Sequence, residues 1–227
     1  MMPTIYKSTT TVAFAEESAK AIESFLNSTL QTKPVVRLAL SGGQSPIPVY
    51  RALAGMAVDW KRVILFLVDE RYVPLASPDS NFRMIQKTLV EPVGKVNRFY
   101  HHDTRQPIHT LVGQYQALLG RLERPLFDLV ILGLGADGHT ASLFPGSMAV
   151  HENQKLVLHT QAPGSTTHRV TLTFPALLSA SKIMFLVQGK NKESVVQRFL
   201  NEKGSADDLP ARGVLAHPDI SLFYCSN

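Results

Sequence analysis

Residues 127–135 read FDLVILGLG, a run of apolar and β-branched residues that stops at glycine. Three further runs have the same form, VVRLALSGG (35–43), RVILFLVDE (62–70) and KIMFLVQG (182–189). Short continuous apolar runs of this kind are typical of strands that are buried on both faces of a parallel sheet. These four runs therefore predict the central strands of such a sheet.

Segments with helical periodicity lie between these runs. Their apolar residues return every three or four positions, which is typical of amphipathic helices. Strands that alternate with helices imply crossover connections and a layered architecture. We therefore expect an α/β fold with three α/β/α layers, a mainly parallel, doubly wound sheet and a single domain over residues 1–227. The predicted helices cover residues 13–31, 80–90, 109–122 and 191–201, and the predicted loops cover residues 72–81 and 160–169.

The composition is that of a globular protein, with 44% hydrophobic and 18% charged residues among 227. No stretch is apolar for long enough to predict a membrane span. The first twenty residues lack the basic segment and apolar core of a secretory signal. Cys225 is the only cysteine, which excludes an intrachain disulfide and a cysteine metal cluster. We expect a cytoplasmic protein with no membrane partner.

The formal net charge of +5 fits either a nucleic-acid partner or an anionic small substrate. The basic residues are scattered along the chain, and no spacing typical of a helix-turn-helix or a zinc finger occurs. A phosphorylated metabolite explains the charge at least as well as nucleic acid does. We therefore expect a small anionic partner and no nucleic acid.

Three of the predicted strand ends carry glycine and polar residues, in segments 41–45, 69–71 and 133–139. Ligands of parallel sheets bind beyond the carboxyl ends of the strands. We therefore expect these three segments to meet at one cleft, although they lie far apart in the sequence.

The first segment contains Ser41, Gly42, Gly43 and Ser45. Its glycines let the backbone approach a ligand closely, and Ser45 can cap a helix that begins with Pro46. Free amides at the start of a helix favour phosphate. The segment lacks the Gly-Lys-Ser/Thr of a Walker loop, so it predicts either a phosphate loop of another kind or an ordinary strand-to-helix turn.

The second segment contains Asp69, Glu70 and Arg71. Buried charge is costly unless it is paired or used on a ligand, and an arginine can bind phosphate or carboxylate with two hydrogen bonds. The alternative is a solvated cluster of salt bridges. Asn81 follows on the same connection, and the simplest interpretation is that it caps the next helix, with Arg83 on the exposed face.

The third segment contains Asp137 and His139. A histidine can take a proton from water near neutral pH, and a neighbouring carboxylate can fix its tautomer. Their place on a glycine-rich strand end favours a catalytic role over a structural one. Near the C-terminal end, Arg169 precedes an alternating strand, and the chain then carries Lys190 and Lys192, either of which can neutralise a phosphate.

Two other patterns predict little chemistry. His101, His102 and Asp103 are adjacent, but they lack a third metal ligand at a suitable spacing, so they are a weak zinc signal. A serine hydrolase is not supported because no G-x-S-x-G motif is present.

Taken together, the motifs resemble the 6-phosphogluconolactonase family over nearly the whole chain. Each motif is weak alone, whereas their ordered set is specific. In order, the motifs are LALSGGQSP, LVDERYVP with DSNFRM, GLGADGHTASLFPG, RVTLTFPALLSA and GKNKE.

The resemblance implies hydrolysis of 6-phospho-D-glucono-1,5-lactone to 6-phosphogluconate, without a metal or an organic cofactor. It implies that His139 activates water, with Asp137 as its orienting partner. The phosphate would lie at the 41–45 turn with help from Lys192, inside a basic pocket. The substrate-binding residues that we expect are Ser41, Gly42, Gly43, Ser45, Asp69, Arg71, Asn81, Arg169 and Lys192.

Two competing functions share parts of this pattern. The related glucosamine-6-phosphate deaminases have a similar Asp-Gly-His loop followed by a glutamate, where this chain has Phe144. A phenyl ring cannot transfer a proton, which favours the lactonase. A sugar-phosphate sensor would keep the phosphate loop, but it would usually carry a DNA-binding segment. We expect a monomer or a weak homo-oligomer.

Overall fold

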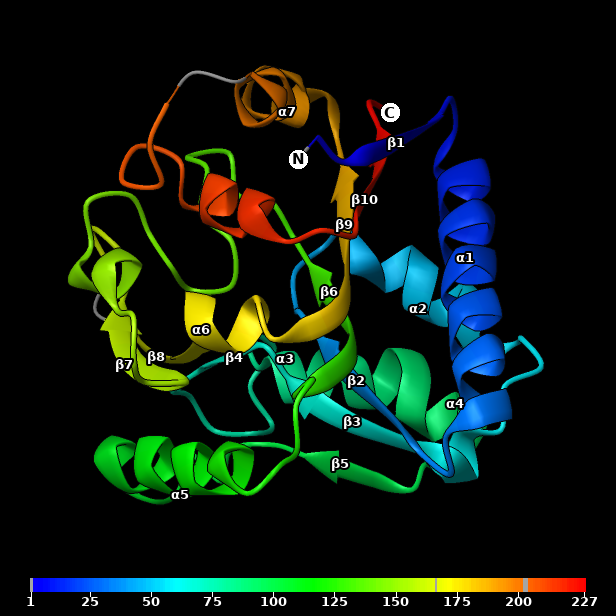
Figure 1. Ribbon diagram of the computed structural model, residues 1–227, viewed down its shortest axis with the longest axis horizontal. Helices are drawn as coiled ribbons and strands as arrows, with labels where there is room; N and C mark the ends of the chain where they lie inside the picture. Colours follow the sequence, from blue (N-terminus) through cyan, green and yellow to red (C-terminus); the bar gives the residue numbers. More distant parts are fainter. Residues whose placement is uncertain (1, 166, 202–203) are drawn as a thin grey trace.

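The computed structural model describes residues 2–165, 167–201 and 204–227. Its main sheet has seven strands in the order β1-β10-β9-β6-β2-β3-β5, and every neighbouring pair is parallel (Figure 1). This confirms the predicted parallel sheet. Its strands are β1 (Thr4–Ser8), β2 (Val36–Leu40), β3 (Val63–Leu67), β5 (Arg98–Tyr100), β6 (Phe127–Leu132), β9 (Ala180–Gln188) and β10 (Ile220–Cys225).

Helices cover both faces of the sheet, as the three-layer prediction requires. Helices α1 and α2 pack on one face and helices α5, α6 and α7 on the other (Figure 1). Residues 129–132 of β6 alternate between the two apolar cores, and the whole strand is buried, which explains why it reads as an apolar run. The helices are α1 (Thr11–Thr32), α2 (Pro46–Ala54), α3 (Asn81–Ile85), α4 (Glu91–Val93), α5 (Ile108–Gly120), α6 (Phe174–Leu177) and α7 (Glu193–Leu200).

A second, three-stranded antiparallel sheet was not predicted. It has the order β4-β8-β7, with β4 at Asp69–Arg71, β7 at Val157–Gln161 and β8 at His168–Leu172. The prediction of a loop over residues 160–169 is wrong at both ends, since they belong to β7 and β8. β7 mixes buried and exposed residues, and β8 begins with an exposed and a half-buried residue, so the apolar signal of this hairpin is weak. The strand predicted after Arg169 corresponds to β8. Thr166, within the same stretch, lies outside the described residues.

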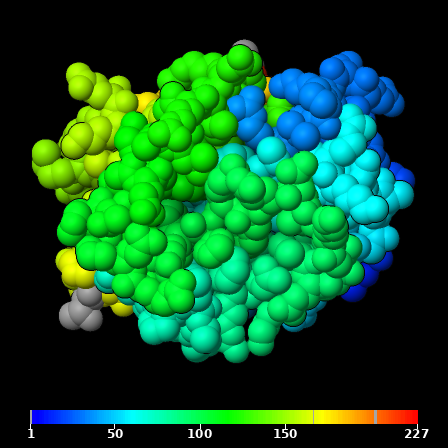
Figure 2. Space-filling model, turned by 90° about the horizontal axis from the view of Figure 1, so that it is seen from below, coloured from blue at the N-terminus to red at the C-terminus, as the bar shows by residue number. Residues whose placement is uncertain are grey.

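The predicted helix over residues 80–90 is not one regular α-helix. After α3 the chain makes a π-helical turn at Gln86–Val90 and then enters α4. Seen from below, the chain from α3 to α5, in green tones, forms the middle of the surface (Figure 2). In the described part of the chain, no helix is both long and apolar enough to cross a membrane.

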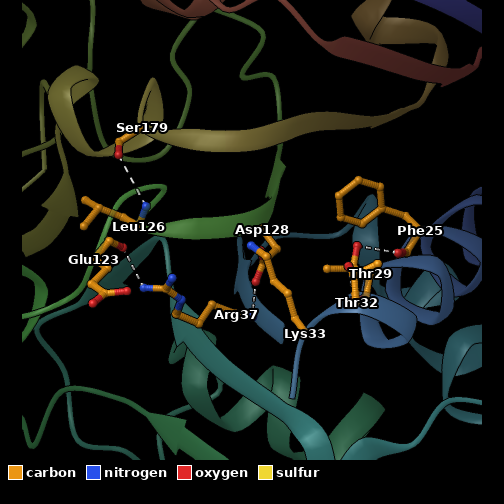
Figure 3. A network of polar contacts seen from close by, with 9 residues as sticks. All are labelled: Phe25, Thr29, Thr32, Lys33, Arg37, Glu123, Leu126, Asp128 and Ser179. Carbon is orange, nitrogen blue, oxygen red and sulfur yellow. Dashed lines mark hydrogen bonds and ion pairs between the residues drawn. The ribbon is translucent and has the colours of Figure 1, made fainter. Parts of the chain in front are cut away.

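A polar network holds together the amino ends of β2, β6 and β9 (Figure 3). Asp128 accepts hydrogen bonds from the backbone N–H of Arg37, at 2.8 Å, and from the ammonium group of Lys33. The Arg37 guanidinium donates to the carbonyl of Glu123 at 3.0 Å. These contacts connect the end of α1 to two strands of the central sheet.

Candidate active site

The three polar strand ends meet, as predicted, at one cavity of about 350 Å³. Loops beyond β2, β6 and β9 contribute to it, and so do β4, α3 and β8. The cavity therefore lies at the carboxyl edge of the parallel sheet, where ligands of this architecture bind. Its lining residues are 41–46, Asp69, Arg71, Asn81, 133–135, His139, Ala141, Arg169, Gln188, Asn191 and Lys192.

The turn after β2 is shaped by close packing. A Cβ atom on Gly42 would lie 1.9 Å from Oδ1 of Asn81, and Gly43 has a φ of +97°. Both positions therefore favour glycine. The hydroxyl of Ser41 is buried and has no hydrogen-bond partner in the described chain. It is a polar group inside the cavity that is left available to a ligand.

Ser45 stands at the start of α2, but the prediction that its side chain caps this helix is wrong. The Ser45 backbone is already helical, and its side chain makes no cap hydrogen bond in the described structure. Instead, its hydroxyl accepts a hydrogen bond from the backbone N–H of Gln188 at 3.1 Å. Ser45 thus ties the turn after β2 to the end of β9.

Glu70 is not part of a solvated salt-bridge cluster. It is buried and accepts hydrogen bonds from the backbone N–H groups of Arg71, Asn81 and Phe82 and from the Ser80 hydroxyl. Burial raises the pKa of Glu70, although these hydrogen bonds oppose the shift. The side chain holds β4 against the start of α3.

Asn81 is not the helix cap, because Ser80 accepts the capping hydrogen bond from the Arg83 backbone N–H at 3.2 Å. Asn81 is instead the first residue of α3 and is buried in the wall of the cavity. Its amide donates to the backbone carbonyl of Asp69 at 2.9 Å and to the carboxylate of Asp69 at 3.2 Å. The other oxygen of that carboxylate accepts from Ser142 at 2.6 Å. Asp69 is therefore a buried, hydrogen-bonded carboxylate in the cavity wall.

Arg71 and Arg169 are paired directly across the antiparallel strands β4 and β8. Like charges at such a pair destabilise each other. Burial and the Arg71 charge both lower the pKa of Arg169, while nearby carboxylates, Asp69 first among them, oppose this shift. The Nε atoms of both arginines are buried without a hydrogen-bond partner in the described chain. An anion in the cavity would relieve the repulsion and give these donors an acceptor.

Asp137 and His139 form a hydrogen-bonded pair after β6. Their Oδ1 and Nδ1 atoms are 2.6 Å apart, and Asp137 also accepts from the His139 backbone N–H at 3.1 Å. Partial burial raises the pKa of Asp137, but the contacts with His139 outweigh it and lower the pKa to about 2. A carboxylate on Nδ1 selects the tautomer in which Nε2 accepts a proton. His139 lines the cavity, whereas Asp137 supports it from behind.

The surroundings of His139 fix the position of its ring. A Cβ atom on Gly135 would lie 2.1 Å from its Nδ1 atom, so glycine leaves the space that the ring occupies. The Phe144 ring lies 4.9 Å away, between centroids, and the guanidinium carbon of Arg169 is 6.0 Å from the Phe144 centroid. Ala141, which also lines the cavity, has a φ of +53° that is unfavourable for a residue other than glycine.

Of the two candidate lysines, only Lys192 is among the described residues that line the cavity. Burial lowers the pKa of Lys192, while the charge of Asp137 raises it. Gln188 and Asn191 also line the cavity and were not predicted. Their position in the QGKNK stretch beyond β9 was the available signal.

Comparison with known proteins gives consistent results. The family model for glucosamine-6-phosphate isomerases/6-phosphogluconolactonase matches residues 9–222. The 6-phosphogluconolactonase of Thermotoga maritima is 38% identical over 186 residues, which cover 80% of this chain and 82% of that protein. The crystal structure of the Thermotoga maritima enzyme aligns with a TM-score of 0.87 and 31% identity, and it covers 99% of this chain and 100% of that one.

A 6-phosphogluconolactonase from Shewanella baltica aligns with a TM-score of 0.90 and 27% identity over the full length of both chains. The family match spans most of the sequence, and the structural alignments include the whole parallel sheet. The chain therefore belongs to the glucosamine-6-phosphate isomerase/6-phosphogluconolactonase family.

Proposed function

We propose that this protein is a 6-phosphogluconolactonase, which hydrolyses 6-phospho-D-glucono-1,5-lactone to 6-phosphogluconate. One observation carries the proposal: His139, paired with Asp137, lines a cavity together with two half-buried arginines whose buried Nε atoms have no hydrogen-bond partner in the described chain. The arrangement offers a proton acceptor beside several anion-binding groups. A phosphorylated lactone needs both. The names of the similar proteins support the same reaction.

His139 acts as the general base in this proposal. It takes a proton from water as the water oxygen attacks the lactone carbonyl carbon. The tetrahedral intermediate then collapses, the bond from that carbon to the ring oxygen breaks, and His139 returns the proton to the ring oxygen. Asp137 holds the productive tautomer and stabilises the imidazolium that forms between these two steps.

The anionic groups of the substrate are assigned to the polar walls of the cavity. The phosphate lies at the turn that contains Ser41 and Gly43, with Lys192 as the neighbouring cation. Arg71 and Arg169 complete the basic surface, and Arg71 or loop amides stabilise the oxyanion of the intermediate. The free donors of Ser41, Arg71 and Arg169 support this assignment.

Phe144 argues against the deaminase alternative. Its ring is buried against His139, and it offers no group that can transfer a proton. A sugar-phosphate sensor would need the phosphate turn but not the His139–Asp137 pair.

The test is lactone hydrolysis by the purified protein and a His139→Asn variant. The lactone is generated in place from glucose 6-phosphate, and 6-phosphogluconate dehydrogenase traps its product. This coupling measures acceleration above the spontaneous hydrolysis. We expect His139→Asn to lose about 10²- to 10⁴-fold in kcat/KM, the range for loss of general-base catalysis.

His151→Asn is the matched control, since His151 also pairs with a carboxylate, Asp207, at 3.0 Å, but lies outside the cavity lining in the described structure. Its activity should equal that of the wild type. Wild-type activity in a folded His139→Asn variant would overturn the mechanism but not the function. No acceleration by the wild type would overturn the function, and ammonia release from glucosamine 6-phosphate would then separate a deaminase from a sensor.

A further inference from the structure

A second cavity, of about 190 Å³, lies beyond the carboxyl end of the edge strand β5. It is formed by the chain that follows β5 and by one side of α5, which belong to the green part of the surface in Figure 2. None of its lining residues lines the first cavity. The lining residues are Tyr100, His101, His102, Asp103, Leu111, Gln114, Tyr115 and Leu118.

His102 is the unusual residue of this cavity. Its side chain is 3% exposed, and its ring meets the Tyr115 ring nearly edge-on, with centroids 4.5 Å apart. No hydrogen bond within the described chain involves either ring nitrogen, and neither is among the buried atoms without a partner, so both can be reached from the cavity. A buried ring that presents free nitrogen atoms to a cavity can hydrogen-bond a molecule that enters it.

The charge state of His102 restricts the chemistry of that ligand. Burial, together with the neighbouring His101, lowers the pKa of His102 to about 3. The neutral imidazole therefore presents one donor and one acceptor. It is suited to a molecule that carries an acceptor and a donor on one edge.

The cavity walls favour a flat, uncharged molecule. Tyr100, His101 and Tyr115 supply rings, and His101 is fixed by stacking on Phe82, with centroids 4.2 Å apart. Rings of this kind bind planar partners by stacking or edge-to-face contact.

Charge in the cavity disfavours an anion. Among the described residues, no lysine or arginine lines this cavity. The Asp103 carboxylate does line it, and the hydrogen bonds from Arg105 hold its pKa well below the ordinary range. The wall therefore offers a phosphate group no unpaired cation, since the Arg105 guanidinium is engaged with Asp103.

We propose that this cavity is a binding site for a neutral, planar heteroaromatic molecule of one or two rings, whose polar edge hydrogen-bonds to His102. Cavities for drug-sized ligands measure about 300–1,000 Å³, so the smaller volume here fits a free nucleobase-sized molecule better than a nucleotide. The site is separate from the lactonase proposal and does not depend on it.

Adenine is the probe, and its binding to the full chain is measured by calorimetry. We expect saturable binding that weakens at least tenfold in His102→Phe, which keeps the ring against Tyr115 but removes both nitrogens. Leu118→Trp fills the cavity and should have the same effect if His102→Phe does not fold. His109→Asn changes an exposed histidine of α5 that does not line the cavity, and it should bind adenine like the wild type.

Cyclohexanol and inorganic phosphate test the chemical class of the ligand. Neither should compete with adenine, since the first is not planar and the second is an anion. Absence of saturable adenine binding would overturn the proposal, and so would equal binding by the wild type and both cavity variants. Competition by cyclohexanol would indicate an unspecific apolar cavity, and competition by phosphate would indicate an anion site. Either result would also overturn the proposal.

Discussion

The two ends of the central strands differ in whether the buried polar groups near them have hydrogen-bond partners. At the amino ends, both carboxylate oxygens of Asp128 accept hydrogen bonds, one from Lys33 and one from the Arg37 backbone (Figure 3). At the carboxyl ends, three buried polar atoms of one cavity have no partner in the described chain. The main sheet thus has a satisfied network at one edge and an unsatisfied one at the other, where β4 and β8 of the small sheet supply two of the three unpartnered atoms.

The unsatisfied atoms are the Ser41 hydroxyl and the Nε atoms of Arg71 and Arg169. An unpaired donor also occurs near the amino ends, at Nε1 of Trp60, but it is neutral. An unpaired buried polar group costs about 1–3 kcal/mol, and more if it is charged. What distinguishes the carboxyl ends is therefore the grouping of such atoms, two of them charged, around one cavity.

This difference shows how stability and function are separated in the molecule. Polar groups at the amino ends use their hydrogen-bonding capacity within the protein and stabilise it. Polar groups at the carboxyl ends keep part of that capacity for a ligand, at a cost in stability. Substitutions of these polar groups at the carboxyl ends should therefore lower activity without lowering the free energy of unfolding. Substitutions of those at the amino ends should lower the free energy of unfolding without lowering activity.

Among the substitutions that compare the two ends of the strands, Arg169→Met should have the largest effect. This variant keeps a long side chain but removes a charge of the basic surface that binds the anionic substrate, so kcat/KM for the lactone should fall about 100- to 1,000-fold, comparable with the loss of one charged donor in an active site. The free energy of unfolding should stay unchanged or rise, because the repulsion from Arg71 disappears. The coupled lactone assay and denaturant unfolding measure the two quantities.

Arg37→Met is the control, since this arginine belongs to the amino-end network. It should leave kcat/KM within about twofold of the wild type, because it lies at the opposite edge of the sheet. An Arg169→Met variant that is active but less stable would contradict the separation.

Asp128→Asn tests the opposite end of the strands. The substitution keeps the size of the side chain but removes the charge that Lys33 and the Arg37 backbone share. Because hydrogen bonds to charged groups contribute about 1.5–3 kcal/mol, the free energy of unfolding should fall by about 2 kcal/mol. The value of kcat/KM should not change.

Asp219→Asn is the matched control for this prediction. Asp219 also pairs with a lysine, Lys182, but its side chain is 51% exposed, compared with 2% for Asp128. Exposed ion pairs contribute little, so unfolding should change by less than about 1 kcal/mol. Equal effects of the two substitutions would show that burial of Asp128 is not the source of its contribution.

Much of this arrangement could be predicted from the sequence because its signals are local. Buried strands read as apolar runs, and their polar ends identified the cavity through the topology of parallel sheets. The edge strands β1 and β5 were missed, since their residues are largely exposed or half-buried, and of the small sheet only the strand after Arg169 was predicted. Their position depends on partners that lie far away in the sequence.

The roles of individual polar residues were harder to predict than their presence in the site. Ser45 and Asn81 both fit a helix cap by position, yet each uses its side chain on another segment. Gln188 and Asn191 carry no charge, and although Asn191 lies within the GKNKE motif, only the folded cavity shows that both side chains line the site. Local preferences depend on neighbouring residues in the sequence, whereas the site is assembled from six separate stretches of the chain.

Gly42→Ala is expected to have a smaller effect than Arg169→Met. It should change both the free energy of unfolding and the lactone KM. The added methyl group would lie 1.9 Å from Oδ1 of Asn81. The Asn81 side chain would therefore have to move away from Asp69, to which its amide nitrogen donates two hydrogen bonds. Overpacking of this kind costs about 1–3 kcal/mol of unfolding free energy. The lactone KM should rise as well, because Asn81 lines the cavity.

Gly113→Ala is the control for that substitution. A Cβ atom on Gly113 meets no atom within 4 Å, and this glycine is exposed in the middle of α5. Alanine should therefore stabilise the protein by about 0.5–1 kcal/mol through its higher helix propensity. A stabilising Gly42→Ala would show that the turn after β2 has room that its packing against Asn81 does not indicate.

The smallest effect concerns Asp137 and appears only at acid pH. Contacts with His139 lower the pKa of Asp137 from its ordinary value of 3.8 to about 2 in the folded protein. A carboxylate with a lowered pKa contributes stability that is fully present above pH 3.8 and is lost as the pH falls toward 2.

Asp137→Asn lacks this contribution at every pH. The difference in Tm between the wild type and Asp137→Asn should therefore be constant near pH 5 and shrink between pH 4 and pH 2. In a His139→Asn background this pH dependence should become weaker, because the imidazole is gone while the backbone N–H of residue 139 still donates to the carboxylate. An undiminished pH dependence without His139 would show that the imidazole does not stabilise the Asp137 carboxylate, and the pairing proposed for catalysis would then lose its main physical support.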